Sequence, residues 1–201
     1  MGMTRKFFLI SAITVLHFSL MAQLKSQPLQ VGDAISDVSV KTDAGNPVAL
    51  RKLIAEKPAV LIFYRGGWCP YCSRHLQALL PIESELLAAG YQLLAISPDQ
   101  PSKLREKPDF KQLNYSLFSD SSMDAAKAFG IAFEVDAATL AKYKQYGIDL
   151  EAASGQSHHM LLHPAVFLVD AKGIIRFAYV NEDYKVRLEP EKIMEAARTA
   201  H

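Results

Sequence analysis

The sequence predicts an α/β domain with a central mixed sheet flanked by helices. Apolar runs without alternation, which are typical of strands buried on both faces, recur between segments whose apolar residues have helical spacing. The chain then ends in a β-hairpin, whose turn is Ala171, Lys172 and Gly173, and one more helix. The predicted order is strand–helix–strand–helix followed by strand–strand–helix, with additional material before the hairpin.

The elements follow from local patterns taken in order. Gly66 and Gly67 end the second strand, Gly90 ends the helix after it, and Pro81 is expected to kink that helix. The segment 133–163 is the least regular, with one helix expected within it. The expected strands are 38–41, 59–64, 91–97, 164–170 and 174–180, and the expected helices are 50–56, 70–90, 123–129, 137–146 and 189–200.

Composition and length predict one globular domain. The chain has 201 residues, of which 50% are hydrophobic and 21% charged, and it has no internal repeat or low-complexity tract. We place this domain at residues 29–201. Its basic and acidic side chains nearly balance, so the sequence predicts neither nucleic-acid binding nor a polybasic membrane patch.

The N-terminal residues 1–22 have the pattern of a signal peptide. Arg5 and Lys6 precede the apolar run 7–22, which is shorter than the roughly 20 residues that a membrane-spanning helix needs. We therefore expect an exported protein, periplasmic or extracellular, that begins at Gln23 and has no stable membrane span after cleavage. An uncleaved anchor and a cytosolic start remain the alternatives.

The two cysteines, Cys69 and Cys72, lie in the stretch YRGGWCPYC between a buried strand and the expected start of a helix at Pro70. Unpaired backbone N–H groups and the helix dipole favour a thiolate at this position. Cys69, nearer the helix end, is expected to be the more exposed and more acidic thiol. Arg65 is a candidate for an additional positive charge there, and Trp68 is a candidate for shielding the site from water.

Two other roles for the cysteine pair are weaker. A disulfide that closes a loop of two residues removes little chain entropy, so it would be a poor structural crosslink. A zinc site needs two further ligands, and the candidates His158, His159 and His163 lie in one loop where histidines are usually solvated. Redox chemistry is therefore the favoured interpretation, and no metal or bound cofactor is expected.

Four blocks resemble the alkyl hydroperoxide reductase and thiol-specific antioxidant (AhpC/TSA) family, in its peroxiredoxin-like branch. They are VLIFYRGGWCPYC, LLAISPD, SLFSDSSMDAAKAFGI and PAVFLVDAKGIIRFAYVNEDY, in family order. The resemblance implies a thioredoxin-like fold with a peroxiredoxin-type insertion before the C-terminal hairpin. It also implies an antioxidant oxidoreductase with a redox-active cysteine pair.

The family's peroxide-binding motif, Pro-x-x-x-Thr-x-x-Cys with a distant Arg, is only partly present. Its Cys corresponds to Cys72, but its Thr, Pro and Arg positions are occupied by Cys69, Arg65 and Pro164. The Trp-Cys-x-x-Cys sequence is instead similar to that of thioredoxin. That likeness implies a cis His163–Pro164 bond beside the cysteines, with a trans proline that starts an edge strand as the alternative.

The main hypothesis is a thiol-disulfide oxidoreductase in which Cys69 attacks and Cys72 resolves. The alternative is a thioredoxin-dependent peroxiredoxin with Cys72 as the peroxidatic and Cys69 as the resolving thiol. The expected partners are a thioredoxin-like or other thiol reductant and a protein disulfide or hydroperoxide substrate. A minor alternative is a copper-binding protein that uses the cysteines and a nearby histidine.

Other residues receive lesser roles from the sequence. Trp68, Pro70, Pro164 and Arg65 are the predicted substrate-positioning residues. A packing role is expected for three residues of the segment DYKVRLEP, namely Tyr184, Arg187 and Glu189.

Overall fold

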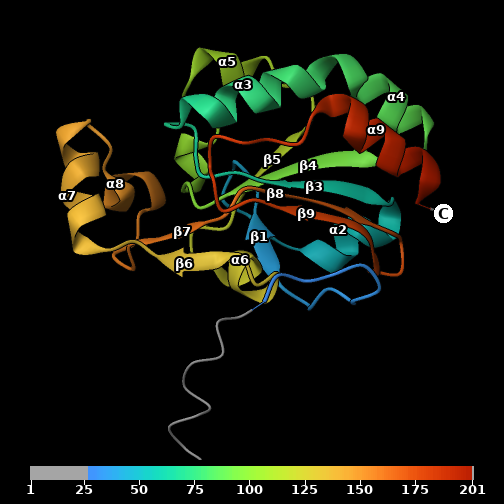
Figure 1. Cartoon of the computed structure of the whole chain (residues 1–201), viewed down its shortest axis with the longest axis horizontal. Coiled ribbons are helices and arrows are strands. Elements are labelled where there is room, and N and C mark those ends of the chain that lie inside the picture. The colour runs from blue at the N-terminus through green and yellow to red at the C-terminus, as the bar shows by residue number, and fades with distance from the viewer. Residues whose placement is uncertain (1–26, 201) are drawn as a thin grey trace, which may run out of the picture.

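The computed structural model describes residues 27–200 and is built on a seven-stranded sheet (Figure 1). The strand order is β2-β1-β5-β4-β3-β8-β9. Strands β3, β4 and β5 are parallel, while β8 pairs antiparallel with β3 and the outer pairs are also antiparallel. The sheet is therefore mixed, as the sequence predicts. The strands are β1 Ser39–Lys41, β2 Pro47–Ala49, β3 Ala59–Phe63, β4 Gln92–Ser97, β5 Ser116–Ser119, β8 Ala165–Val169 and β9 Ile175–Val180.

Helices cover both faces of this sheet (Figure 1). One face carries α3 Pro70–Leu79, α4 Glu83–Ala88, α5 Pro108–Lys111 and α9 Pro190–Thr199. The opposite face carries α2 Leu50–Glu56 and α6 Asp124–Ala128. Among residues 27–200, every helix is too short or too polar to span a lipid bilayer. The predicted signal peptide, residues 1–22, lies outside the described residues.

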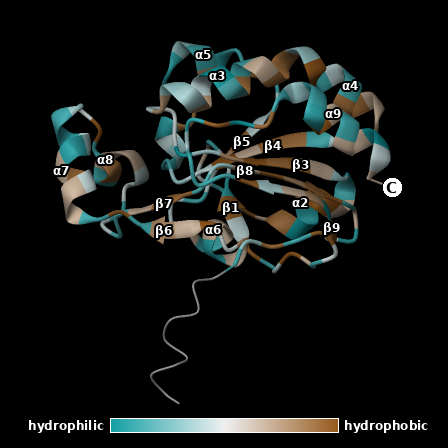
Figure 2. Cartoon of the chain, in the orientation of Figure 1, coloured by the Kyte–Doolittle hydropathy of each residue, from teal (hydrophilic) through white to brown (hydrophobic). Residues whose placement is uncertain are grey.

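Apolar side chains form a core on each face of the sheet. The central strands β3 and β8 are buried along their whole length, because helices cover both of their faces. Figure 2 shows these strands in the colours of hydrophobic residues. Phe63, Phe129 and Phe167 pack together in one core, with ring centroids 4.8–6.0 Å apart. The unbroken apolar runs in the sequence thus correspond to strands buried on both faces.

The segment between β5 and β8 contains more structure than its sequence indicates. It holds a second sheet of β6 Ala132–Glu134 and β7 Met160–Leu162, and the helices α7 Ala137–Gln145 and α8 Leu150–Ser154. The helices α7 and α8 lie to one side of the main sheet (Figure 1). We call residues 132–162 the insertion.

Proline breaks the first long helix more severely than a kink. A 3₁₀ turn at Leu80–Ile82 separates α3 from α4, with Pro81 inside it. Proline removes a backbone donor and clashes with the preceding turn, so two helices form instead of one. The described part of the chain has no cis peptide bond, so Pro164 is trans. The cis bond that the likeness to thioredoxin implies is therefore wrong, and β8 is an interior strand rather than an edge strand.

Candidate active site

The cysteine pair lies where β3 ends and α3 begins, as the sequence predicts. Cys69 is the N-cap residue of α3, and Pro70 occupies the first helical position, where its missing N–H costs nothing. Cys72 lies in the first turn, so both sulfurs are near the positive end of the helix. The side chains are free thiols in this structure.

Both thiols are buried, which differs from the expected exposure of Cys69. The exposed fractions are 1% for Cys69 and 0% for Cys72. Trp68, half-buried, packs against both the core that contains the cysteines and the smaller apolar cluster of the insertion. Pro70 is exposed at the start of the helix, so of the predicted positioning residues it is the one that faces solvent.

The two thiols differ in acidity in the predicted direction. The pKa of Cys69 is lowered to about 6, chiefly because the Cys72 thiol can donate a hydrogen bond to it. The backbone N–H of Cys72 and the positive charges of Arg65 and Arg187 add to this effect, and burial opposes it. Burial and the neighbouring Cys69 raise the pKa of Cys72. At neutral pH the first proton therefore leaves from Cys69, and Cys72 stays a thiol.

Arg65 is a buried cation held by aromatic rings. Only 3% of it is exposed, and its Nε atom has no hydrogen-bond partner. Its guanidinium carbon lies 5.1, 5.7 and 4.2 Å from the ring centres of Trp68, Tyr143 and Tyr184. Its Nη2 donates to the hydroxyl of Tyr143. Because the ion pairs found within residues 27–200 involve other residues, this charge is available to the cysteine pair.

Arg187 contacts the pair directly, so the packing role expected for it is wrong. Its Nη2 lies 3.5 Å from the Cys72 sulfur and donates to it. Its Nη1 donates to the carbonyl oxygens of Tyr184 and Val186, which fixes the guanidinium. Pro164 occupies the position of the distant Arg of the peroxide-binding motif, but Arg187 brings a guanidinium to the Cys72 sulfur from a different segment. The sequence identifies the segment DYKVRLEP without indicating this contact.

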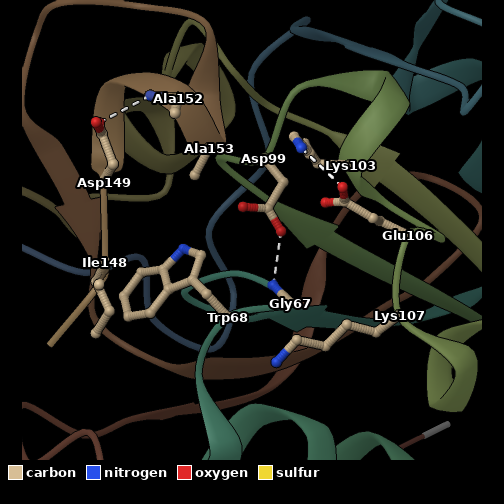
Figure 3. A pocket seen from close by; sticks show the side chains of 11 residues that line it. Gly67, Trp68, Asp99, Lys103, Glu106, Lys107, Ile148, Asp149, Ala152 and Ala153 are labelled. Carbon is tan, nitrogen blue, oxygen red and sulfur yellow. Dashed lines mark hydrogen bonds and ion pairs between the residues drawn. The ribbon is translucent and has the colours of Figure 1, made fainter.

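The loop before Cys69 is held by Asp99, which follows β4. The Asp99 Oδ2 atom accepts a hydrogen bond of 2.6 Å from the Gly67 backbone (Figure 3). Gly66 has a φ of +139°, and a Cβ there would lie 2.4 Å from Trp68 Nε1 and 2.7 Å from Asp99 Oδ1. Burial raises the pKa of Asp99 to about 7. Asp99 thus couples the end of β4 to the strand-to-helix turn that presents Cys69.

A hollow of about 210 Å³ opens beside this loop (Figure 3). Trp68 and Ile148 form apolar walls, and the carboxyl of Asp99 lies on its inner side. Lys103 and Glu106 pair with each other at its rim, at 2.8 Å. The hollow thus lies next to the cysteine pair, between the insertion and the rest of the domain.

The histidines of the insertion do not join the cysteines. His158 Nε2 lies 2.9 Å from the carbonyl oxygen of Ser121, and His159 pairs with Glu151 at 2.6 Å. The ring of His163 stacks on Phe133, with centroids 4.5 Å apart. No group of three or more His, Cys, Asp or Glu among the described residues could hold a metal ion. The geometry gives the copper alternative no ligand set.

Pro164 directly precedes β8, at the end of that strand nearest the cysteine pair, and its peptide bond is trans. Pairing of Phe63 with Ala165 places Pro164 beside the end of β3, where the loop to Cys69 begins. Its carbonyl accepts from the backbone of Asn181, at 3.1 Å. Of the residues predicted for the site, Arg65, Trp68, Cys69 and Cys72 lie together at the strand-to-helix junction.

A buried pair of unequal thiols at a strand-to-helix junction, with two guanidinium groups, defines a thiol-dependent oxidoreductase. The AhpC/TSA family profile matches residues 31–178, most of the chain, and the protein belongs to this family. Peroxiredoxin Bcp of Escherichia coli K12 is 27% identical over 158 residues, which are 79% of this chain and 88% of that protein. A curated relative from Haemophilus influenzae is 32% identical over 104 residues, 52% of this chain and 66% of its own.

Solved structures of other proteins share the fold. Peroxidoxin BcpB from Mycobacterium tuberculosis superposes with a TM-score of 0.66 at 18% identity, covering 85% of this chain and 97% of its own. Peroxiredoxin Q of Xanthomonas campestris gives a TM-score of 0.63 at 19% identity and covers 86% and 98%. The fold is therefore thioredoxin-like, as the sequence resemblance implies.

Proposed function

We propose that this protein reduces hydroperoxides with the Cys69–Cys72 pair and is restored by an external thiol. The observation that carries this proposal is a thiolate-prone sulfur, buried beside two guanidinium groups, in a fold of the AhpC/TSA family. Relatives named peroxiredoxins support it. A small hydroperoxide needs far less access to a buried sulfur than a protein disulfide does.

The proposed reaction begins at Cys69, because the thiolate is the nucleophilic form of cysteine. The thiolate attacks one peroxide oxygen and the O–O bond breaks, so that the leaving oxygen takes a proton and Cys69 becomes a sulfenic acid. The Cys72 sulfur then attacks the Cys69 sulfur, and water leaves as the disulfide forms. The charges of Arg65 and Arg187 stabilise the negative charge that develops on the leaving oxygen.

The assignment of the attacking sulfur rests on electrostatics rather than on the family motif. The motif's cysteine corresponds to Cys72, but burial and Cys69 raise the pKa of that thiol. A neutral thiol is a poor nucleophile. We therefore assign attack to Cys69 and resolution to Cys72, which keeps the order of the main hypothesis but changes its substrate.

One rapid-mixing experiment tests both parts of the proposal. Reduced wild type, Cys69→Ser and Cys72→Ser are mixed with hydrogen peroxide while the fluorescence of Trp68, the single tryptophan, is followed. We expect wild type and Cys72→Ser to react, with sulfenic acid trapped at Cys69. Oxidation of wild type no faster than that of a free thiol would refute the peroxidase function. Sulfenic acid in the Cys69→Ser variant alone would reassign the attack to Cys72.

Disulfide exchange is the second candidate, favoured by the acidity of Cys69 within a Trp-Cys-x-x-Cys sequence. The burial of both sulfurs argues against it, because a protein disulfide must reach the sulfur directly. Reduction of insulin disulfides at a rate well above that of a small dithiol would favour exchange.

We also propose that the protein works outside the cytoplasm. The support is the sequence of residues 1–22, a short basic region followed by an apolar run. Fractionation of cells that produce the full chain, with sequencing of the mature N-terminus, tests this location. A product that starts at Gln23 outside the cytoplasm agrees with it, and a full-length cytoplasmic product contradicts it.

A further inference from the structure

A second hollow, of about 360 Å³, lies between the first turns of α3 and residues 185–190. Its charged side chains are Arg74, Lys185, Arg187 and Glu189, so that three cations face one carboxylate. The ion pairs formed within residues 27–200 use other basic residues. The hollow is therefore a place of net positive charge that suits a small anion.

His75, which also lines this hollow, does not add charge at neutral pH. Burial, followed by the charge of Arg187, lowers its pKa to about 4. Its Nε2 lies 3.1 Å from the carbonyl oxygen of Leu188. The cationic character of the hollow thus comes from the two arginines and the lysine.

Arg187 connects this hollow to the redox pair. The same guanidinium that lines the hollow donates to the Cys72 sulfur at 3.5 Å. It is only partly buried, and its other contacts are carbonyl oxygens of its own loop. An anion in the hollow would compete with the Cys72 sulfur for this guanidinium.

The oxidised pair favours attack on that same sulfur. In thiol-disulfide exchange the thiol of lower pKa is the better leaving group. When the reductant is bonded to Cys72, that sulfur has no proton to donate, but the backbone N–H of Cys72 and the charges of Arg65 and Arg187 still lower the pKa of Cys69. Attack at Cys72 therefore releases a stabilised thiolate. The favoured point of attack, the Cys72 sulfur, is therefore a hydrogen-bond partner of Arg187, which lines the cationic hollow.

We propose that this hollow binds a low-molecular-weight thiol that carries a carboxylate, and that this thiol reduces the Cys69–Cys72 disulfide at Cys72. The proposal rests on the proposed function only in requiring that the disulfide forms during turnover. The reductant's thiolate bonds to the Cys72 sulfur, the Cys69–Cys72 bond breaks, and Cys69 leaves as a thiolate. A second thiolate attacks the reductant's sulfur in this mixed disulfide, so Cys72 leaves and takes a proton. Two thiols have then become one disulfide, and their two electrons have passed to the pair.

The test compares three thiols of similar size and different charge. The protein is oxidised with diamide instead of peroxide, so that the outcome does not depend on peroxidase activity. Reduction by 3-mercaptopropionate, 2-mercaptoethanol and cysteamine is followed by Trp68 fluorescence, with each rate divided by the thiolate concentration. We expect the anionic thiol to react about tenfold faster than the neutral one at low salt, and cysteamine to be slowest. This preference should decline toward unity in about 1 M salt.

Charge-neutralising variants distinguish the hollow from the overall field of the protein. Arg74→Gln and Lys185→Gln should each reduce the preference for 3-mercaptopropionate over 2-mercaptoethanol severalfold. Lys192→Gln, whose lysine pairs with Glu195 on α9, is the matched control and should keep the preference. Equal rates for the three thiols, or a preference that survives in both hollow variants, would overturn the proposal.

Discussion

Replacement of Arg65 by methionine separates the electrostatic role of this residue from a structural one. Arg65 is buried, has no carboxylate partner among the described residues, and lies among three aromatic rings. Methionine keeps much of its length and apolar contact but removes its charge. If Arg65 serves mainly to favour the thiolate, then Arg65→Met should change the acidity of Cys69 more than the stability of the fold.

The expected size follows from the charge. Two unit charges roughly 10 Å apart interact by about 1–2 kcal/mol at an effective dielectric constant of about 20, which corresponds to about one pH unit. The pKa of Cys69, about 6 in wild type, should then rise to about 7. At pH 7 the thiolate fraction would decrease from about nine tenths to about one half. Methionine also removes a buried charge whose Nε has no hydrogen-bond partner, which offsets the lost contacts with Tyr143 and the rings. The free energy of unfolding should therefore change by less than about 1 kcal/mol.

The assay is the pH dependence of alkylation of Cys69, resolved by mass spectrometry, together with urea unfolding. Arg105→Met is the matched control, since Arg105 donates to the carbonyl oxygens of Phe110, Leu113 and Tyr115. That variant should lose about 1–3 kcal/mol of stability and keep the pKa of Cys69. An unchanged pKa in Arg65→Met, or a loss of stability like that of the control, would refute the reasoning.

Three further substitutions test the surroundings of the pair. Tyr143→Phe keeps the ring but removes the hydroxyl that accepts from Arg65, so the free energy of unfolding in urea should decrease by about 1–3 kcal/mol. Tyr146→Phe, which changes an exposed side chain, is the control and should leave it unchanged. The Asp99 carboxyl has a folded-state pKa of about 7 against an ordinary value of 3.8, so the folded state binds the extra proton between these values and stability decreases as pH rises through them. This contribution is at most about 4 kcal/mol, and Asp99→Asn should flatten the urea-unfolding profile between about pH 4 and pH 7; an unchanged slope contradicts it. Gly66→Ala should destabilise the fold by more than about 2 kcal/mol and slow the reaction with peroxide, because the added Cβ meets Trp68 and Asp99. Gly32→Ala is the control: its Cβ has open space, so it should cost only the backbone strain of about 1 kcal/mol.

Local patterns were sufficient for most of the fold. The helix expected at 50–56 forms over those residues, and the hairpin strands form as β8 and β9. These elements have strong signals because their apolar residues repeat within a few positions. The strands β6 and β7 do not show in the sequence, since each has three residues and pairs with a partner well over twenty positions away, Phe133 with Leu161 for example. No local pattern encodes such a long-range pairing.

The sequence by itself determined where the cysteine pair lies in the fold. A buried strand, two glycines, and a Cys-Pro-Tyr-Cys start to a helix place both sulfurs at the positive end of α3, and these relations are local. The greater acidity of Cys69 follows from its position at the N-cap and from the neighbouring Cys72. The choice between structural, metal-binding and redox roles therefore needed no distant residue.

Tertiary structure alone decided which other groups act on the pair and how deeply its sulfurs are buried. Tyr143 comes from the insertion, Arg187 from the segment after β9, and Asp99 from the end of β4, and sequence distance gives no indication that they meet. The burial of Cys69 also depends on these segments, because a position at a helix start is exposed unless other parts of the chain cover it. Spacing along the chain thus fixed the position of the two sulfurs at the start of α3, and long-range packing fixed the charges around them and their accessibility to solvent.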